Sequence, residues 1–460
     1  LHSLQSAPFA LADSSPAGPP PRPTFAEALS FWLKLGFVSF GGPAGQIAIM
    51  HTELVEQRRW ISERRFLHAL NFCMLLPGPE AQQLATYLGW LLHRTWGGIA
   101  AGALFVLPSL VILIALSWIY IALGDVPVVA GLFYGIKPAV VAIVLHAAWR
   151  TGGRTLKNGA LWAIAAAAFI ALFALRVPFP AIVLVAGLLG AVGGRYWPRR
   201  FLPGGSGHGG THTLSQAPAL IDDDTPTPPH ARFARARLAR ALAIGLGLWI
   251  GVIAVLAAQF GGQGLPTQLG LFFTKAALLT FGGAYAVLPY VYQGAVEHYG
   301  WLTGPQMIAG LALGETTPGP LIMVVAFVGF VGGWQAPLFG ADSMLASGVL
   351  AACVVTFFTF LPSFVFIFAG APLVEATHGD LRFTAPLTAI TAAVVGVIVN
   401  LALFFAGHVF WPAGLAAAVD WPAVAIAAGA MLALFRFKIG AVPVIAGCAL
   451  AGLAWHLGLQ

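Results

Sequence analysis

Charge is what this sequence most lacks. Asp, Glu, Lys and Arg make up 8% of its 460 residues, whereas soluble globular domains carry about 25%. The mean hydropathy is +0.85. With so few charged groups the chain cannot provide a soluble surface, which excludes the soluble classes of protein and predicts an integral membrane protein.

Cysteine and known catalytic patterns are also scarce. The three cysteines, Cys73, Cys353 and Cys448, lie within apolar stretches, so they predict packing thiols and no disulfide framework. The chain contains neither the nucleotide-binding pattern G-x-x-x-x-G-K-[ST] nor the zinc-binding pattern H-E-x-x-H. An ATP-driven pump is therefore disfavoured, and an intramembrane enzyme is a weak alternative. We expect no catalytic residue, no metal site and no cofactor.

Long apolar runs are abundant, and two polar segments divide them. Residues 97–123 and 241–260 are typical of the runs, each long enough to cross the hydrocarbon core as a helix. Residues 1–23, rich in Pro, Ser and Ala, predict a disordered tail and not a signal peptide. Residues 195–237, rich in Gly, Pro and Arg, predict a cytoplasmic linker whose arginines set orientation and bind no nucleic acid.

The membrane parts on either side of the linker, 24–194 and 238–460, are related by duplication. At an offset of 241 (275 − 34 = 241) the matching pairs are Lys34 with Lys275, Phe40 with Phe281, Glu56 with Glu297, Trp60 with Trp301 and Pro77 with Pro318. After a 13-residue insertion in the second half, Pro108-Ser109 matches Pro362-Ser363. Chance similarity between apolar helices rarely keeps such residues in register, so we infer two copies of one unit.

Lys and Arg clusters predict the orientation of the first copy. The positive-inside rule places residues 58–65, Arg94, residues 150–157 and the linker in the cytoplasm. Two spans fit between successive clusters, but residues 25–57 and 66–92 must then begin and end on the same side. We expect both segments to fold back at turns rich in glycine and proline.

The second copy begins with one extra span, residues 238–260, which has no counterpart in the first. This span carries the chain outward from the linker, so we expect the second copy to be inverted and the C-terminus at Gln460 to lie outside. The predicted fold class is an all-α integral membrane protein with inverted-topology repeats and discontinuous, re-entrant helices. Many secondary transporters have this architecture, with the substrate held where the repeats meet.

Each copy carries two break motifs, Phe-Gly-Gly and Pro-Gly-Pro. Backbone groups freed at membrane depth are tolerated only where protein or water satisfies them, so four breaks in register predict a cavity-lining role. A simple proline kink in a packed helix is the alternative. The prolines expected to form the breaks are Pro43, Pro77, Pro79, Pro318 and Pro320.

These motifs resemble a known family. The stretches "FVSFGGPAGQIAIMHTELVEQRRWISERRFLHALNFCMLLPGPEAQQLATYLG", "TKAALLTFGGAYAVLPYV" and "GWLTGPQMIAGLALGETTPGPLIMVVAFVGF" are similar to those of the chromate ion transporter family, in its long form with two fused halves. The resemblance covers about residues 25–457. It implies export of chromate, with sulfate as a related oxyanion, across the inner (plasma) membrane and driven by an ion gradient.

A tetrahedral dianion needs N–H donors and a positive potential. Helix N-termini supply both, and glycine lets the backbone approach an anion closely. The residues that we expect to bind the substrate are Gly41, Gly42, Gly78, Gly282, Gly283 and Gly319, with Thr316 and Thr317 as hydroxyl donors.

Four charged residues near the breaks have two interpretations each. Lys34 and Lys275 precede their Phe-Gly-Gly motifs by about two helical turns; they are expected to face the anion path, or else to snorkel to the membrane surface. Glu80 and Glu315 flank the Pro-Gly-Pro turns on opposite sides. Each is a candidate for carrying a coupling proton, or for satisfying backbone amides or pairing with a lysine.

The sequence therefore predicts a secondary transporter. A passive anion channel lined by the same helix ends is the alternative. The expected partners are a chromate-like oxyanion and the lipid bilayer, with no nucleic acid, and a homodimer is left open.

Overall fold

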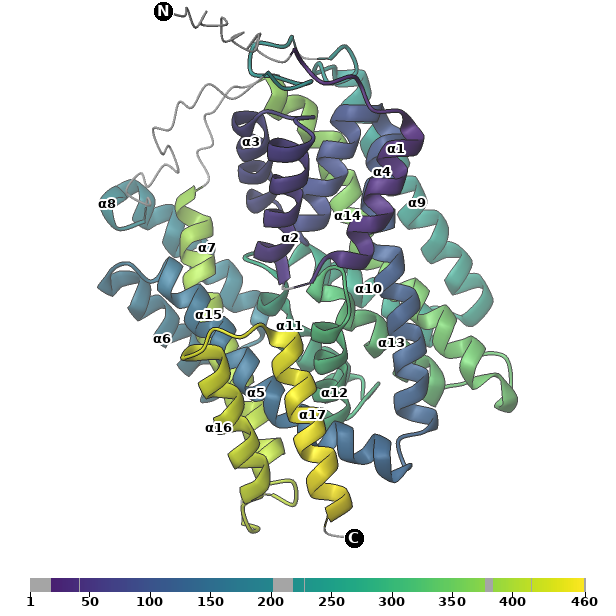
Figure 1. Ribbon diagram of the computed structural model, residues 1–460, viewed down its shortest axis with the longest axis vertical. Helices are drawn as coiled ribbons and strands as arrows, with labels where there is room; N and C mark the ends of the chain where they lie inside the picture. The colour runs from purple at the N-terminus through teal and green to yellow at the C-terminus, as the bar shows by residue number, and fades with distance from the viewer. Residues whose placement is uncertain are drawn as a thin grey trace, which may run out of the picture.

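The computed structural model describes residues 18–40, 42–201, 218–226, 228–376, 384–414 and 416–458. Predictions for Gly41, Gln460, the first 17 residues and residues 202–217 of the linker fall outside this part. Regular structure in it is helical (Figure 1). The α-helices are α1 Phe25–Val38, α2 Gly42–His51, α3 Glu63–Leu75, α4 Glu80–Ala122, α5 Pro127–Thr155, α6 Gly159–Phe173, α7 Phe179–Tyr196, α8 Pro198–Phe201, α9 Arg235–Phe260, α10 Leu265–Leu278, α11 Ala284–Tyr292, α12 Gly304–Thr316, α13 Val324–Gln335, α14 Met344–Ala376, α15 Thr384–Phe410, α16 Trp421–Phe435 and α17 Ala441–Gly458.

The helices are those of a membrane protein. Seven of them, within the described residues, are long and apolar enough to cross a bilayer, namely α4, α5, α7, α9, α14, α15 and α17. Many large apolar side chains, such as Leu184 and Trp162, face outward, as they do on surfaces that lipid covers. The predicted class, an all-α integral membrane protein, is confirmed.

Helix α4 is two helices that lie side by side. The backbone leaves the helical region at His93 and Arg94, where Arg94 has φ 57° and ψ −155°. A Cβ atom added to Gly89 would lie 2.5 Å from the Cβ of Ala101, so the residues before the kink pack against those after it. We call residues 80–92 α4a and residues 95–122 α4b; only α4b is a full span.

The duplication is visible in the helix boundaries. The π-helices Thr52–Gln57 (η1) and Gln293–His298 (η2) are 241 residues apart (293 − 52 = 241), and so are α3 and α12 (304 − 63 = 241). Helix α9, which contains the span 238–260, has no partner among the described residues of the first copy. Two copies of one chain of helices, plus one additional helix, therefore make up the molecule.

Each copy begins with two helical hairpins whose tips are the sequence breaks. In the first copy, α1 and α2 form one hairpin, and α3 and α4a form the other. The rings of Phe72 on α3 and Tyr87 on α4a are 6.2 Å apart. In the second copy, α10 is followed by α11, with Phe272 stacked on Tyr290 at 4.9 Å. Figure 1 shows α1 to α3 in the upper part of the molecule and α10 to α12 below them. The hairpins thus approach from opposite ends and meet near the middle.

Candidate functional site

Backbone hydrogen bonds between the two copies join the four breaks. The N–H of Gly78 donates to the carbonyl of Thr280 at 2.7 Å, and the N–H of Gly319 donates to the carbonyl of Ser39 at 2.9 Å. These pairs are equivalent under the duplication, because 319 − 78 and 280 − 39 both equal 241. Each Pro-Gly-Pro turn is therefore bonded to the residue that precedes Phe-Gly-Gly in the other copy.

Both central glycines occupy places that no other residue can take without strain. Gly78 has φ +125°, and a Cβ there would lie 2.5 Å from the Oγ of Ser363. Gly319 has φ +105°, and a Cβ there would lie 2.8 Å from the Cβ of Ser109. The two serines are themselves equivalent (363 − 109 = 254), so the same steric limit operates twice. Positive φ angles also occur at Gly42, Gly282 and Gly283.

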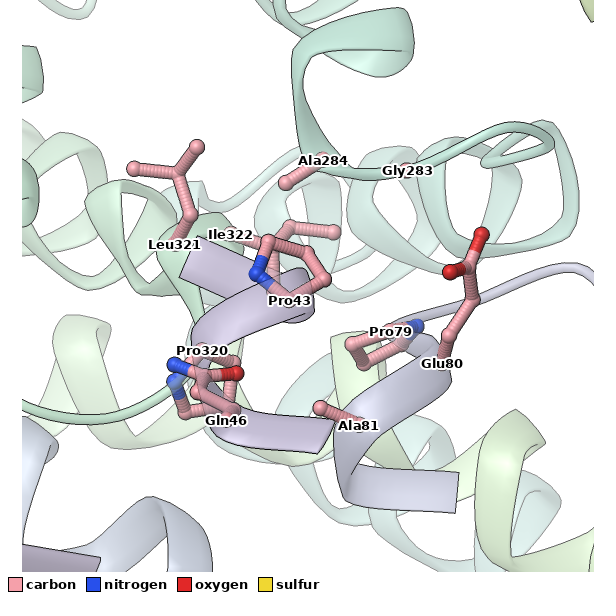
Figure 2. Close-up of a pocket in the computed structure, with 10 residues that line it drawn as sticks. All are labelled: Pro43, Gln46, Pro79, Glu80, Ala81, Gly283, Ala284, Pro320, Leu321 and Ile322. Atoms are coloured by element: carbon pink, nitrogen blue, oxygen red, sulfur yellow. The ribbon is translucent and has the colours of Figure 1, made fainter. Parts of the chain in front are cut away.

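A small cavity lies where the tips meet (Figure 2). Residues from all four breaks line it, among them Pro43, Pro79, Gly283 and Pro320. Its volume is about 10 Å³, which is room for roughly one water molecule. A tetrahedral oxyanion is too large for the cavity in this conformation.

Three helices begin at the cavity with free N–H groups. Helix α4 starts at Glu80, α11 at Ala284 and the short 3₁₀-helix Leu321–Met323 (η3), which leads into α13, at Leu321; all three residues line the cavity. Within the described part of the chain, no side chain of the preceding N-cap residues accepts from these N–H groups. Uncapped helix starts carry a partial positive charge and donors for an anion.

Buried amide side chains complete the tips, and the sequence interpretation missed them. The Nε2 group of Gln46 donates to the carbonyls of Ser39 at 3.2 Å and Gly319 at 2.5 Å. The Nε2 group of Gln83 donates to the carbonyl of Pro77 at 2.8 Å. Their signal in the sequence is an amide in an otherwise apolar helix directly after a break, because an uncharged polar group at that depth needs a partner.

The two acids lie on different sides of the site. Glu80 lines the cavity, and its carboxylate extends toward Gly283 in Figure 2. Glu315, at the end of α12, accepts a hydrogen bond from the hydroxyl of Tyr285 and interacts electrostatically with Arg150. Glu80 is thus the acid next to the free helix starts, whereas Glu315 has a hydroxyl partner of its own.

The structure brings together break glycines and prolines with Glu80, but not the predicted threonines and lysines. The hydroxyls of Thr316 and Thr317 donate to carbonyls of their own helix, that of Leu313 in both cases, and are not among the cavity-lining residues. Lys34 and Lys275 lie on exposed faces of α1 and α10 and are also outside the lining. Their positions fit the alternative interpretation, a lysine that reaches for the membrane surface.

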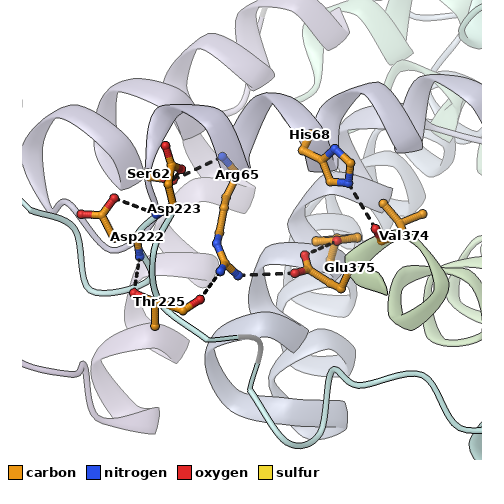
Figure 3. Close-up of polar contacts among 9 residues, drawn as sticks. Ser62, Arg65, His68, Asp222, Asp223, Thr225, Val374 and Glu375 are labelled. Carbon is orange, nitrogen blue, oxygen red and sulfur yellow. Dashed lines mark hydrogen bonds and ion pairs between the residues drawn. The ribbon is translucent and has the colours of Figure 1, made fainter. Parts of the chain in front are cut away.

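A second polar network joins the two copies far from the tips (Figure 3). Arg65 on α3 pairs with Glu375 on α14 at 3.4 Å, and the hydroxyl of Tyr87 on α4a donates to the same carboxylate at 2.5 Å. The side chains of Arg65 and Glu375 are 14% and 9% exposed, so water screens this ion pair little. We call these three residues the latch.

The described end of the linker lies over the latch. The N–H of Ile221 donates to the carbonyl of Trp60, and the carbonyl of Ile221 accepts from the N–H of Ser62. Arg65 donates to the carbonyl of Thr225 (Figure 3). The segment Pro218–Pro226 is thereby tied to the same end of the molecule as residues 58–65, which the sequence also groups with the linker.

The fold and the site define an all-α membrane protein built from two fused copies whose helix breaks meet around a central cavity. The chain belongs to the chromate transporter family, whose profile matches residues 26–191 and 267–453. The two matches start 241 residues apart (267 − 26 = 241), which is the offset of the duplication.

Two of its relatives match over most of both chains, and a third is much shorter. The chromate transport protein of Cupriavidus metallidurans is 30% identical over 436 residues, which are 94% of this chain and 94% of that protein. The chromate transport protein of Pseudomonas aeruginosa is 32% identical over 394 residues, 85% of this chain and 83% of that protein. The uncharacterized transporter YwrB of Bacillus subtilis is 30% identical over 166 residues, 35% of this chain but 83% of YwrB. No solved structure matches the chain.

Proposed function

We propose that this protein is a secondary transporter that exports chromate across the inner membrane, driven by an ion gradient. The relatives named as chromate transport proteins support the substrate. The observation that carries the proposal is the meeting of four helix breaks, with three uncapped helix starts, at one point between the two copies. Such a point offers donors to an oxyanion without a fixed cation that would hold it too tightly.

Transport then proceeds by parting the tips on one side and then on the other. The hydrogen bonds from Gly78 to Thr280 and from Gly319 to Ser39 hold the closed state. These two hydrogen bonds are equivalent under the duplication. Breaking the bond from Gly78 therefore opens the cavity in the same way as breaking the bond from Gly319, but toward the opposite end of the molecule. In a bilayer, the inverted arrangement makes these two ends the two sides of the membrane. Residues 58–65 and the linker are on the cytoplasmic side in this proposal.

Glu80 is the proposed coupling group. An ionised carboxylate beside the free N–H groups of α4 competes with an oxyanion for the same donors, whereas its protonated form does not. Binding of the anion and protonation of Glu80 are therefore linked, so the anion and the proton cross the membrane in the same direction, and the direction of the proton gradient sets the direction of transport. Glu315 is the second candidate, although its hydrogen bond from Tyr285 gives it a local structural role.

A passive oxyanion channel is the second candidate function. A channel requires a continuous path, whereas the cavity at the tips is closed to anything larger than about one water molecule. That observation favours a carrier.

Reconstituted protein distinguishes the two. Proteoliposomes loaded with unlabelled chromate are placed in medium with a trace of labelled chromate. A carrier exchanges one for the other and concentrates the label transiently, and the rate saturates with chromate concentration. An imposed pH gradient accelerates net transport by the wild type but not by Glu80→Gln. Flux that rises linearly with concentration, without exchange, would establish the channel and overturn the carrier.

A further inference from the structure

The hairpins of the two copies are alike, but they pack mainly against different helices. In the second copy, α11 packs against α15, and α12 packs against α5, α15 and α17. In the first copy, α2 packs against α4, and α3 packs against α4 and α14. Figure 1 shows α12 beside α5 and α17 in the lower part of the molecule, and α3 in the upper part. The packing is therefore asymmetric, because α5 and α15 lie against the hairpins of the second copy.

Two contacts mark this packing at the end of the molecule opposite residues 58–65. The rings of Tyr292 on α11 and Phe404 on α15 are 4.2 Å apart. A Cβ atom added to Gly304, the first residue of α12, would lie 3.2 Å from ring atoms of His408 on α15. These contacts hold the end of α15 against the hairpins.

The duplication gives each of these four residues an equivalent in the first copy. The offset is 241 for the hairpins and 254 for α5 and α15, as the matches of the sequence require. The equivalents are His51 for Tyr292 (292 − 51 = 241), Glu63 for Gly304 (304 − 63 = 241), Arg150 for Phe404 (404 − 150 = 254) and Arg154 for His408 (408 − 154 = 254). A contact through rings in the second copy thus corresponds to acidic and basic residues in the first.

The acidic partners lie together on the hairpin of the first copy. The ring of His51 lies between two carboxylates, with Nδ1 3.1 Å from Glu56 and Nε2 2.5 Å from Glu63. The side chains of Glu56 and Glu63 are 53% and 43% exposed, so both are ionised at neutral pH. Even with His51 protonated, this group therefore carries a net negative charge.

The basic partners lie on α5 and have other surroundings in this structure. Arg150 interacts electrostatically with Glu315 of the second copy. Arg154 is exposed and forms no ion pair with any described residue. The structure thus shows the ring contacts at one end of the molecule, while the equivalent charged residues at the other end have different partners.

In a transporter with inverted repeats, the two copies exchange conformations when the site opens to the other side. We propose that Glu63 and Arg154 form an ion pair in that second conformation, and that this pair, with Arg150 near His51 and Glu56, closes the end that carries residues 58–65. The inference rests on the proposed function, which places this end in the cytoplasm, and deepens it by naming residues that close the site on that side. The structure described here is the conformation in which the opposite end is closed.

Exchange of the two charges tests the ion pair. Chromate transport is measured in proteoliposomes, per amount of inserted protein, for Glu63→Arg, Arg154→Glu and the double variant. Each single variant sets two like charges against each other in the second conformation, and we expect the rate to fall about tenfold. The double variant restores opposite charges, and we expect a rate within about twofold of the wild type.

Glu63→Arg combined with Lys157→Glu is the matched control. It has the same net charge as the exchanged pair, but Lys157 lies three residues beyond Arg154, and its Nζ group donates to the carbonyl of Gly153. We expect this control to transport as slowly as Glu63→Arg alone. The pairing would be overturned if the exchanged pair were no faster than Glu63→Arg, or if the control were restored equally.

A disulfide tests the same contact should a reversed charge prevent insertion. Glu63→Cys and Arg154→Cys are combined in a protein whose own cysteines, Cys73, Cys353 and Cys448, are replaced by serine. A disulfide requires Cα atoms within about 7 Å. We expect copper phenanthroline to form it and to stop chromate transport, and dithiothreitol, removed before chromate is added, to restore transport. Thiols that stay reduced under oxidation in a protein that transports chromate would overturn the proposal.

The two proposals fail separately. A wild type that does not transport chromate would overturn the proposed function. Disulfide formation is read from the mobility of the protein on a gel, without any substrate, so it would still decide whether this end of the molecule closes.

Discussion

The two copies share their backbone structure, but they differ in which positions carry polar side chains. The breaks, the π-helices and the cross-copy hydrogen bonds recur at the same offset. The side chains after the breaks do not: Gln46, Glu80, Gln82 and Gln83 of the first copy stand opposite Val287, Leu321, Met323 and Val324 of the second. Glycine and proline fix the geometry of a break wherever it occurs, whereas one set of polar groups suffices for a site that both copies enclose.

The second copy has polar groups of its own, but beside the cavity. Glu315 and Tyr285 form a hydrogen-bonded pair, and the first copy has Met74 and Ala44 at these positions. The polar side chains that line the cavity therefore come from the first copy, and the second contributes helix starts and a neighbouring acid.

The largest effect is expected where the copies are alike. Gly78→Val and Gly319→Val each place a β-branched residue at positive φ and within 3 Å of a serine of the other copy. Strain of about 3 kcal/mol in the transport-competent state corresponds to a loss of at least about a hundredfold in rate. We expect both variants to lose chromate transport in proteoliposomes, with the larger loss for Gly78→Val, because a Cβ at Gly78 would also lie 2.6 Å from the Nε2 group of Gln83, which has no counterpart beside Gly319.

Gly283→Ala is the control for backbone strain alone. Gly283 has φ +99°, but no atom lies within 4 Å of an added Cβ, so only the cost of the conformation applies, about 1 kcal/mol or roughly fivefold in rate. Near-normal transport by either Gly78→Val or Gly319→Val would show that the two Pro-Gly-Pro turns are not both needed for transport.

The breaks could be predicted from the sequence because glycine and proline disrupt a helix locally, whatever surrounds it. For residues 66–92 the positive-inside rule predicts a fold-back, because it places the basic residues at both ends of the segment on one side; re-entry into the membrane stays a prediction. The sequence could not predict which tips bond to each other, because that depends on contacts between residues about 240 positions apart. The sequence left open whether Lys34 and Lys275 face the anion path or the membrane surface for the same reason: spacing defines a face of a helix, but not which neighbour covers it.

The second effect concerns the latch, which joins the two copies at one end of the molecule and has no equivalent set of residues at the other. The positions equivalent to Arg65, Tyr87 and Glu375 are Gln306, Val328 and Ile121, so the opposite end lacks these charges. Glu375→Gln leaves Arg65 without its anion in a nearly buried place. We expect a loss of about 2 kcal/mol in the free energy of unfolding, seen as a lower midpoint of thermal unfolding in detergent.

Glu53→Gln is its control, because the pair between Arg58 and Glu53 lies within the first copy and is more exposed, at 36% and 23%. There the loss should stay under about 1 kcal/mol. Equal midpoints for the two variants would mean that the latch does not hold the copies together.

The third effect is a pH dependence in the docking of the linker segment that contains His230, at the same end of the molecule as the latch. The Nε2 group of His230 donates to the carbonyl of Trp90 at 3.0 Å, and burial, with smaller contributions from Arg94 and Arg22, lowers the pKa of His230. His230 therefore takes up a proton at higher pH when this linker segment is undocked than when it is docked. Docking is strongest above the ordinary histidine pKa of about 6.5 and weakens as the pH falls through it.

Limited proteolysis of the linker measures this. Cleavage should be faster at pH 5.5 than at pH 7.5 in the wild type, after correction for the protease's own pH dependence. His230→Gln keeps a donor but does not titrate, so its corrected rates should be equal. A variant that retains the full difference would assign the pH dependence to other groups.

The smallest effect is expected at the two lysines, where the copies are again alike. Lys34 and Lys275 are exposed and outside the cavity lining, and water and salt screen an exposed charge from an anion about 10 Å along the helix. We expect Lys34→Gln and Lys275→Gln to change the KM for chromate by less than about twofold. Kinetics in proteoliposomes at low and high salt provide the measurement. A several-fold higher KM in both variants at low salt, absent at high salt, would show that the anion reaches the tips along these exposed faces, and the lysines would then belong to its route although they do not line the cavity.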